Sequence, residues 1–326
     1  MKYRQLGNTE LKVSEISVGC SGFWGNRHFS EKKASAVINE AFERGINFFD
    51  TGHNYSSFHA EPRLGRIIKE ILTSNGRSSL IISTKAGTTI PSTPIFSAKK
   101  SNSSDFSPDY IEHSCLESIS NLNCDYLDIF QLHGINQSQI TEPLIERLLI
   151  MKENGMFHYL GVNTHNEDVM RFISKRPELF DMVLIDYNVL QLDREPIICK
   201  LYEAGIGVVA GTVLAQGHLV QGKIGSIKTT ADVWYFARAL LKSTGRILSR
   251  NSIEMRQTLN MLIGMTAAQA AFAYVLGNVK ISSCVFGTTN LSNLHEIIDS
   301  SNLVLKECNK LKILKTFKSL KENISL

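Results

Sequence analysis

Short apolar runs recur along the chain, and each has the length of a β-strand rather than of a helix. The runs are mostly apolar on both faces instead of alternating with polar residues, which is typical of parallel strands covered by helices. On this pattern we expect strands at Ile16–Cys20, Ile46–Asp50, Leu80–Lys85, Tyr126–His133, Tyr159–Asn163, Met182–Asn188, Gly207–Gly211 and Ser282–Gly287.

Apolar residues at helical spacing lie between these runs. Ser30 precedes one such pattern, which Gly45 closes, and Ser107 followed by Pro108 combines a helix cap with proline at the first helical position. Further helices are expected after Thr141, Asn166, Thr266 and Asn290. Strands that alternate with helices over this length predict a (β/α)8 TIM barrel, which typically takes about 250 residues plus insertions. The rival is an open doubly wound sheet, whose first turn usually reads GxGxxG; here that turn reads GCSGFWGN, which favours the barrel.

Three further segments complete the expected architecture. Gly7-Asn8 lies between two short extended stretches of Tyr3–Val13 and predicts an N-terminal β-hairpin at the bottom of the barrel. Long loops follow the third and seventh strands, at Ala86–Phe106 and from Thr212 to about Ser249. Both follow strand C-termini, so we expect them at the C-terminal face, where barrel active sites lie. No linker divides the chain, and we expect a single domain over residues 1–326.

Composition narrows the function classes. Lys and Arg exceed Asp and Glu by 35 to 31, and no dense basic block occurs, so nucleic acid is not the expected partner. The lysines near the C-terminus are expected on the exposed face of a last helix. No run is long and apolar enough for a membrane span, and the N-terminus is too polar for a signal peptide. The six cysteines form no CxxC, so neither a metal site nor a disulfide scaffold is expected, and we expect a cytoplasmic protein.

Polar residues at the ends of predicted strands are the candidates for chemistry. Asp50, Lys85 and His133 each end an apolar run, and Tyr55 follows Asp50 by five residues. Singly, each has an ordinary explanation: a loop cap, a snorkelling lysine, a core histidine, a packed tyrosine. Together they suit acid–base work, because buried Lys and Asp need each other and a nearby ammonium lowers the pKa of a phenol.

Several stretches resemble the aldo-keto reductase superfamily in their order and spacing over nearly the whole chain. They include LGNTELKVSEISVGC, INFFDTGHNY, ISTKAG, CDYLDIFQLHG, TAAQAAFAYVLGN and FGTTNLSNLHE. The resemblance implies an NAD(P)-dependent oxidoreductase that interconverts an aldehyde or ketone, with sugars among the candidates, and its alcohol by hydride transfer. It also implies that Asp50, Tyr55, Lys85 and His133 are the catalytic residues, with Tyr55 as general acid and base.

The resemblance carries over to the cofactor positions less completely. It implies carboxamide contacts from Asn163 and Thr164, while the family's sixth-strand glutamine falls on Leu184 and its stacking aromatic near Gly211. Tyr187 is a candidate to replace that aromatic. The loop over the pyrophosphate would contribute Thr212, Leu214 and Gln216. The segment near the adenosine would contribute Gly287, Thr288, Thr289, Asn293 and Glu296.

Cofactor preference stays open between two dinucleotides. The family default is NADP(H), and the usual basic residue at the 2′-phosphate falls on Asn293. The stretch from Gly287 to Ile297 contains neither Lys nor Arg, which makes NAD(H) a serious alternative. A basic residue from elsewhere, Lys223 or Lys228, is the other solution.

Substrate and biological role are less determined by the sequence. Phe23 and Trp24 after the first strand are candidates for an apolar pocket wall or for packing. Lys99 and Lys100 in the first long loop suit a polar or anionic substrate, or the loop is simply mobile. The expected partner is a small carbonyl compound. The alternative function is a cofactor-sensing regulatory subunit with little turnover, and a barrel enzyme of another family is a third. The oligomeric state is not set.

Overall fold

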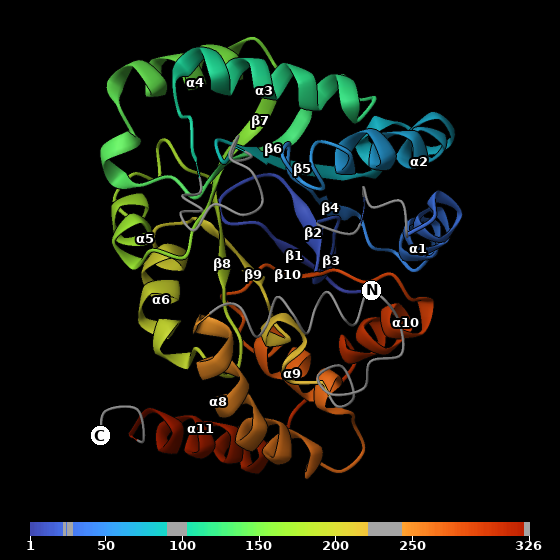
Figure 1. Ribbon diagram of the computed structural model, residues 1–326, viewed down its shortest axis with the longest axis vertical. Helices are drawn as coiled ribbons and strands as arrows, with labels where there is room; N and C mark the ends of the chain where they lie inside the picture. Colours follow the sequence, from blue (N-terminus) through green and yellow to red (C-terminus); the bar gives the residue numbers. More distant parts are fainter. Residues whose placement is uncertain (22–23, 25–28, 90–102, 221–242, 323–326) are drawn as a thin grey trace.

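A closed barrel of parallel strands forms the centre of the computed structural model (Figure 1). The structure describes residues 1–326 except 22–23, 25–28, 90–102, 221–242 and 323–326, and for residues 243–251 only the backbone. The barrel strands follow one another in chain order, and β10 closes the ring by pairing with β3. They are β3 (Ile16–Gly19), β4 (Phe48–Asp50), β5 (Ile81–Ala86), β6 (Leu127–His133), β7 (Phe157–Asn163), β8 (Met182–Asp186), β9 (Gly207–Gly211) and β10 (Ser283–Phe286). The predicted (β/α)8 barrel and all its strands are confirmed.

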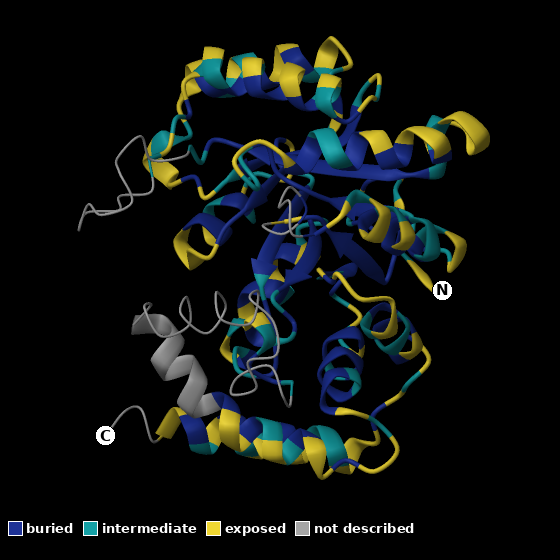
Figure 2. Ribbon diagram, turned by 45° about the vertical axis from the view of Figure 1, so that its right-hand side comes forward, coloured by how far each residue is buried: buried dark blue, intermediate teal, exposed yellow. Residues whose placement is uncertain are grey.

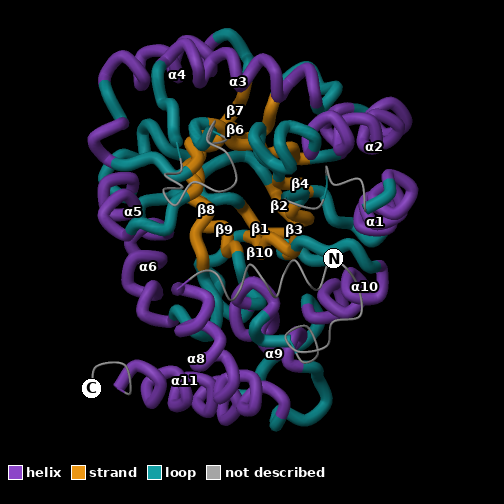
Figure 3. Tube along the Cα trace, viewed as in Figure 1, coloured by secondary structure: helices purple, strands orange, loops and turns teal. Residues whose placement is uncertain are grey.

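Helices ring the barrel, and Figure 3 shows them as an outer layer around the strands. Their buried faces turn toward the barrel and their exposed faces outward (Figure 2), as amphipathic helices require. The α-helices are α1 (Glu31–Glu43), α2 (Ala60–Asn75), α3 (Pro108–Asn121), α4 (Glu142–Glu153), α5 (Glu167–Ile173), α6 (Glu195–Glu203), α8 (Ser243–Asn260), α9 (Ala267–Leu276), α10 (Leu291–Ser300) and α11 (Glu307–Glu322). Short 3₁₀ turns are η1 (Arg77–Ser79), η2 (Gln137–Gln139), η3 (Leu192–Arg194) and η4 (Ala215–Gly217).

The predicted helix starts are confirmed, and the caps explain several of them. The side chains of Ser30, Asn166 and Asn290 each accept a hydrogen bond from a backbone N–H of the first turn. Thr266 and Gln269 form a reciprocal capping box at the start of α9. The pattern did not single out α2, α6 and α8; α2 and α6 begin without a capping side chain.

The N-terminal hairpin closes the bottom of the barrel. Strands β1 (Tyr3–Gln5) and β2 (Lys12–Ser14) pair antiparallel, which confirms the predicted hairpin. Leu6 and Val13 are fully buried in the cluster of side chains that fills the barrel interior. Gly7 at the turn has φ +55°, and a Cβ there would lie 2.4 Å from the backbone oxygen of Gly205. Only glycine lets the turn approach β9 so closely.

The two long loops lie partly outside the described residues. The first has a described stem, in which Thr88 bridges Ser104, whereas Lys99 and Lys100 lie outside the described residues. The second leads into α8, which lies beside α11 at one end of the molecule (Figure 1). Lys223 and Lys228 also lie outside the described residues. None of the described helices is long and apolar enough to cross a membrane.

Candidate active site

Three of the candidate residues point into the mouth of the barrel, at the C-terminal ends of adjacent strands. Asp50 ends β4, Lys85 is the next-to-last residue of β5, and His133 ends β6. Because side chains alternate along a strand, residues an even number apart share a face. Each candidate follows, at such an even spacing, a residue that packs inside the barrel: Phe48, Ile81 and Ile129.

A buried ion pair forms the base of this site. Lys85 Nζ donates to Asp50 Oδ2 at 2.6 Å and to the backbone oxygen of Thr51 at 2.5 Å. The side chains of Lys85 and Asp50 are only 1% and 6% exposed. Gln131 Nε2 donates to Asp50 Oδ1 at 2.8 Å and to Ser83 Oγ at 2.7 Å. Both oxygens of the carboxylate are therefore held, which a buried charge requires.

Tyr55 reaches back from the loop after β4 onto this pair. Lys85 Nζ lies 5.1 Å from the centroid of the Tyr55 ring, and the rings of Tyr55 and His133 meet edge to face at 5.7 Å. The close approach depends on Gly52, where a Cβ would lie 3.1 Å from both Lys85 Cγ and Tyr55 Cε2. The structure thus brings together all four candidates from four separate segments.

The electrostatics of the four groups are set by burial and by the Lys85 charge. Burial raises the pKa of Tyr55 above its ordinary value, and the Lys85 charge offsets only part of that rise. The expected net lowering of this pKa is therefore wrong, because desolvation of this phenol outweighs one nearby ammonium. For Lys85, burial works against the charged form, but the charges and hydrogen bonds of Asp50 and Tyr55 together outweigh it, and the pKa is raised.

His133 is neutral at physiological pH. Burial, followed by repulsion from the Lys85 charge, lowers the pKa of His133 to about 3. A neutral imidazole has one N–H donor and one acceptor nitrogen. Nδ1 of His133 is buried with no hydrogen-bond partner among the described residues. The site therefore combines a phenol next to a permanent cation with a neutral imidazole donor, a set suited to giving a proton to a carbonyl oxygen and orienting it.

The wall of the mouth formed by β7, β8 and β9 carries a further polar side chain, that of Asn163. Asn163 ends β7 opposite His133 in the strand register and is 7% exposed. Its amide has no hydrogen-bond partner among the described side chains and backbone groups. Beside it, Leu184 of β8 packs into the barrel interior and Gly211 ends β9 without a side chain. This wall therefore combines the Asn163 amide with the apolar side chain of Leu184 beside it.

Comparison with known proteins identifies the chain. A sequence model of the Aldo/keto reductase family matches residues 15–315. The chain belongs to the aldo/keto reductase family. It is 28% identical over 306 residues to L-galactose dehydrogenase of Arabidopsis thaliana, which covers 91% of this chain and 86% of that protein. It is 26% identical over 313 residues to L-glyceraldehyde 3-phosphate reductase of Escherichia coli, covering 93% of this chain and 88% of that protein.

Two further likenesses bear on fold and on role. The structure of an aldo-keto reductase from Bacillus halodurans in its holo form superposes with a TM-score of 0.77 at 24% identity, covering 97% of this chain and 96% of that one. At this identity the likeness shows the fold. A probable voltage-gated potassium channel subunit beta of Arabidopsis thaliana is 25% identical over 318 residues, covering 93% of this chain and 92% of that protein.

The remaining residues that the resemblance assigned to cofactor binding fall into two groups in this aldo/keto reductase. Thr164 Oγ1 accepts from the backbone N–H of Asn166, so its hydroxyl is partly engaged in the turn before α5. Thr212 and Gln216 have positive φ values in the turn after β9, and Leu214 packs against the core. At the other end, Thr288 accepts from the N–H of Asn290. Gly287 and Thr289 are exposed, and Asn293 is half-buried.

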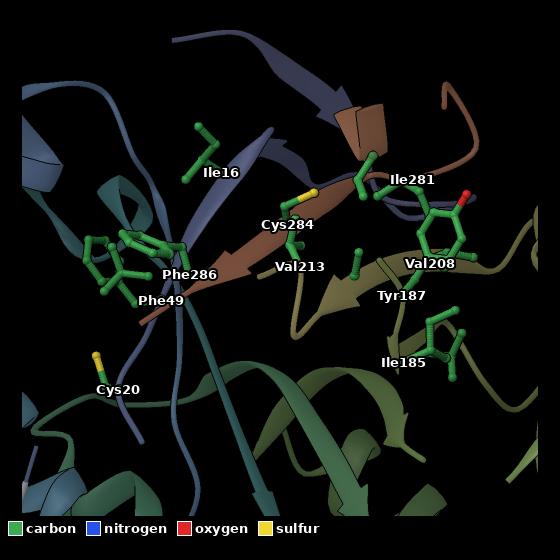
Figure 4. Close-up of a cluster of buried hydrophobic side chains, with 14 of the residues drawn as sticks. Ile16, Cys20, Phe49, Ile185, Tyr187, Val208, Val213, Ile281, Cys284 and Phe286 are labelled. Atoms are coloured by element: carbon green, nitrogen blue, oxygen red, sulfur yellow. The ribbon is translucent and has the colours of Figure 1, made fainter. Parts of the chain in front are cut away.

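Two of these assignments meet structural obstacles. Tyr187 is fully buried, and its hydroxyl donates to Glu195 Oε1 at 2.9 Å. Figure 4 shows it among core residues such as Val208 and Ile281, outside the barrel interior. Stacking on a nicotinamide would require this ring to leave the core. Glu296 Oε1 accepts from the hydroxyl of Thr266 at 2.6 Å, so its carboxylate is already engaged between α10 and α9.

The candidates for the substrate pocket are only partly described. Trp24 is 1% exposed and meets Phe29 edge to face at 5.4 Å, which favours packing for this ring. Phe23 lies outside the described residues.

Two polar residues of the site, and one buried acid behind it, were missed in the sequence. Gln131 and Asp186 lie two residues beyond Ile129 and Leu184, so the period-two alternation was the signal that could have placed both inside the mouth. Glu61 lies on the outer side of β5, where Thr84 Oγ1 donates to its Oε1 at 2.5 Å. Burial raises the pKa of Glu61. No sequence signal marks that acid, because α2 meets β5 only in the folded barrel.

Proposed function

We propose that this protein interconverts the carbonyl group of a small sugar-like aldehyde or ketone and the corresponding alcohol with a nicotinamide dinucleotide. The observation that carries the proposal is the buried cluster of Asp50, Tyr55, Lys85 and His133 in the mouth of the barrel. Oxidoreductases among the relatives support the reaction class. The dinucleotide supplies or accepts the hydride when bound, and the protein supplies positions and charges.

The four side chains of this cluster have different roles in the proton transfer. The Tyr55 hydroxyl gives a proton to the carbonyl oxygen in reduction and takes it back in oxidation. Lys85 stabilises the phenolate that reduction leaves behind, because its ammonium lies against the ring. Asp50, held by Gln131, keeps Lys85 charged and in place. His133, neutral at the working pH, donates the hydrogen bond that orients the carbonyl.

The residues present fit a nicotinamide dinucleotide at the mouth. The amide of Asn163 has no hydrogen-bond partner among the described residues and can bind a carboxamide. At the adenosine end, Thr288, Thr289 and Asn293 line the start of α10, whose N-terminus favours a phosphate. Because Gly287–Ile297 contains neither Lys nor Arg, we propose use of NAD(H) alongside the family default, NADP(H).

The relatives indicate the substrate class. The names of two of them specify L-galactose and L-glyceraldehyde 3-phosphate, a sugar and a sugar phosphate. A polyhydroxylated carbonyl compound offers several hydroxyls to the polar groups of the mouth, and we propose this class for the present chain.

A paired titration tests the proposal. NADH and NADPH are titrated into the purified protein and into Tyr55→Phe, with nicotinamide fluorescence as the readout, and a panel of aldoses and their phosphates is then assayed. We expect both proteins to bind at least one cofactor with similar affinity, and Tyr55→Phe to lose about 10²–10⁴-fold in turnover. Absence of binding by the unmodified protein, or normal turnover by the variant, would refute the proposal.

A regulatory subunit that senses the cofactor is the second candidate. The likeness to a probable potassium channel subunit beta favours it. Turnover separates the two: a sensor binds cofactor tightly but reduces every aldehyde of the panel slowly, whereas an enzyme has a substrate that it turns over rapidly.

A further inference from the structure

Asp186 is a buried acid that the proposed proton transfer does not use. It ends β8, two residues beyond Leu184, whose side chain packs inside the barrel. By strand alternation the Asp186 side chain also faces the barrel axis, one layer higher, at the mouth. Its side chain is 21% exposed, so the carboxylate is partly shielded from water.

The Asp186 carboxylate is held by two neighbouring side chains and lies beside a glycine. Oδ2 lies 2.8 Å from Nδ1 of His165, and Thr212 also hydrogen-bonds the carboxylate. Asp186 pairs with Gly211 in the strand register, and a Cβ on that glycine would lie 3.8 Å from Oδ1. A side chain at position 211 would grow over this oxygen. Glycine leaves that space free of a side chain.

The position of Asp186 in the ring of strands puts it opposite the proton-transfer residues. The barrel order is β10, β3, β4, β5, β6, β7, β8, β9, so β8 stands across from β4, the strand that leads into Tyr55. The interior of an eight-stranded barrel is only wide enough for side chains or one small ligand. Any group lodged between Tyr55 and the far wall therefore lies close to Asp186. The charge of Asp186 already contributes to raising the pKa of Tyr55, so its field reaches the reacting position.

His165, which pairs with the carboxylate at 2.8 Å, and the charge of Arg194 offset part of that field. Lys85 and Asp50 face the mouth as a pair of opposite charges. Arg194 contacts the backbone oxygens of Asp186 and His165 rather than the carboxylate. Burial opposes the charged form of Asp186, but the hydrogen bond and charge of His165 lower its pKa below the ordinary value. The acid is thus an anion at neutral pH, next to the unpartnered amide of Asn163.

The oxidised and reduced nicotinamide rings differ in charge, so a nearby anion attracts one more strongly than the other. The oxidised ring carries a positive charge and the reduced ring carries none. We propose that Asp186 is a specificity-determining residue that favours binding of the oxidised cofactor over binding of the reduced one. The inference rests on the proposed function, because it places the nicotinamide between Tyr55 and Asn163.

Equilibrium binding tests the inference without any turnover. Dissociation constants are measured calorimetrically for the oxidised and reduced forms of whichever cofactor binds, on the unmodified protein and on Asp186→Asn. One unit charge at a partly exposed site should shift the ratio of the two constants by on the order of tenfold. We expect Asp186→Asn to lose affinity for the oxidised form alone, and Asp186→Glu to restore most of the preference.

The matched control is Asp193→Asn, which removes an acid that pairs with Lys321 on the surface of η3. It should leave the ratio unchanged. Should Asp186→Asn fail to fold, Asp186→Ser removes the same charge with a smaller side chain. Equal loss of affinity for both forms, or an unchanged ratio, overturns the inference while leaving the proposed function intact. Absence of binding by the unmodified protein overturns both.

Discussion

Inside the mouth of the barrel, the charged side chains are buried and held in an ion pair. Lys85 donates to one oxygen of the Asp50 carboxylate and Gln131 donates to the other. The three residues come from three different strands. At the start of α10, on the same face of the barrel, the polar groups are neutral instead. The side chain of Asn290 accepts from the backbone N–H and the hydroxyl of Ser292, and Thr288 holds the N–H of Asn290.

We therefore expect the mouth to perform the proton transfer and the start of α10 to set the cofactor preference. The mouth can perform proton transfer only if its buried charges stay paired, because an unpaired buried charge costs several kcal/mol. The α10 segment stabilises its own backbone with amide and hydroxyl groups, and Gly287–Ile297 contains neither Lys nor Arg for a phosphate. Its histidine, His295, pairs with Glu40 instead. We therefore expect changes in the mouth to be severe and changes at α10 to adjust cofactor preference.

Breaking the ion pair should have the largest effect. Lys85→Met removes the cation next to Tyr55 and leaves Asp50 buried without its partner. We expect turnover to fall about 10²–10⁴-fold and the free energy of unfolding to fall by about 3–5 kcal/mol. Urea denaturation and steady-state assays measure the two losses. The double variant Lys85→Met/Asp50→Asn should recover part of the stability but no turnover. A double variant no more stable than the single one would argue against the pairing.

The neutral state of His133 gives a smaller, pH-dependent effect. Its pKa is lowered to about 3 in the folded protein, whereas an unfolded histidine titrates near 6.5. Between these values the unfolded chain binds one more proton, so the free energy of unfolding falls as the pH falls from about 6.5 toward 3. The expected contribution to the slope is about 1.4 kcal/mol per pH unit.

Urea denaturation between pH 6 and pH 4 measures this slope. His133→Gln should lose the contribution, because glutamine does not titrate. His113→Gln, on the exposed side of α3, is the matched control and should keep the slope of the unmodified protein. Parallel slopes for the unmodified protein and His133→Gln would mean that His133 titrates normally in the fold.

Adding a cation to α10 should have the smallest of the three effects, a change in cofactor affinity. It would also give the start of α10 a charged side chain, as the mouth already has. Asn293→Arg places a guanidinium where the resemblance puts the 2′-phosphate. We expect the affinity for NADPH to rise by about tenfold relative to NADH, the gain of one charge-assisted contact. Fluorescence titration measures both constants. Asn302→Arg, beyond the other end of α10, is the control, and an equal change in both variants would place the phosphate elsewhere.

Features that depend on interactions over a few positions of the chain were easier to predict from the sequence than features that depend on distant contacts. Strand runs and capping residues such as Ser30 and Thr266 act over a few positions, so the barrel and most helix starts were predictable. Helices α2 and α6 lack a capping side chain and were not singled out. The four residues of the mouth were predictable because three end strands that all meet at one face. Gln131 and Asp186 were missed, although strand alternation places both on the same interior face.

By itself, the sequence determined the alternation of strands and helices, the closing hairpin and the residue types at the strand ends, because these depend on local periodicity and turn chemistry. Only the tertiary structure decided the charge states. Tyr55 has a raised pKa despite Lys85, and Tyr187 lies in the core rather than in the mouth. Desolvation is set by every element packed around a group, and no stretch of sequence contains that information.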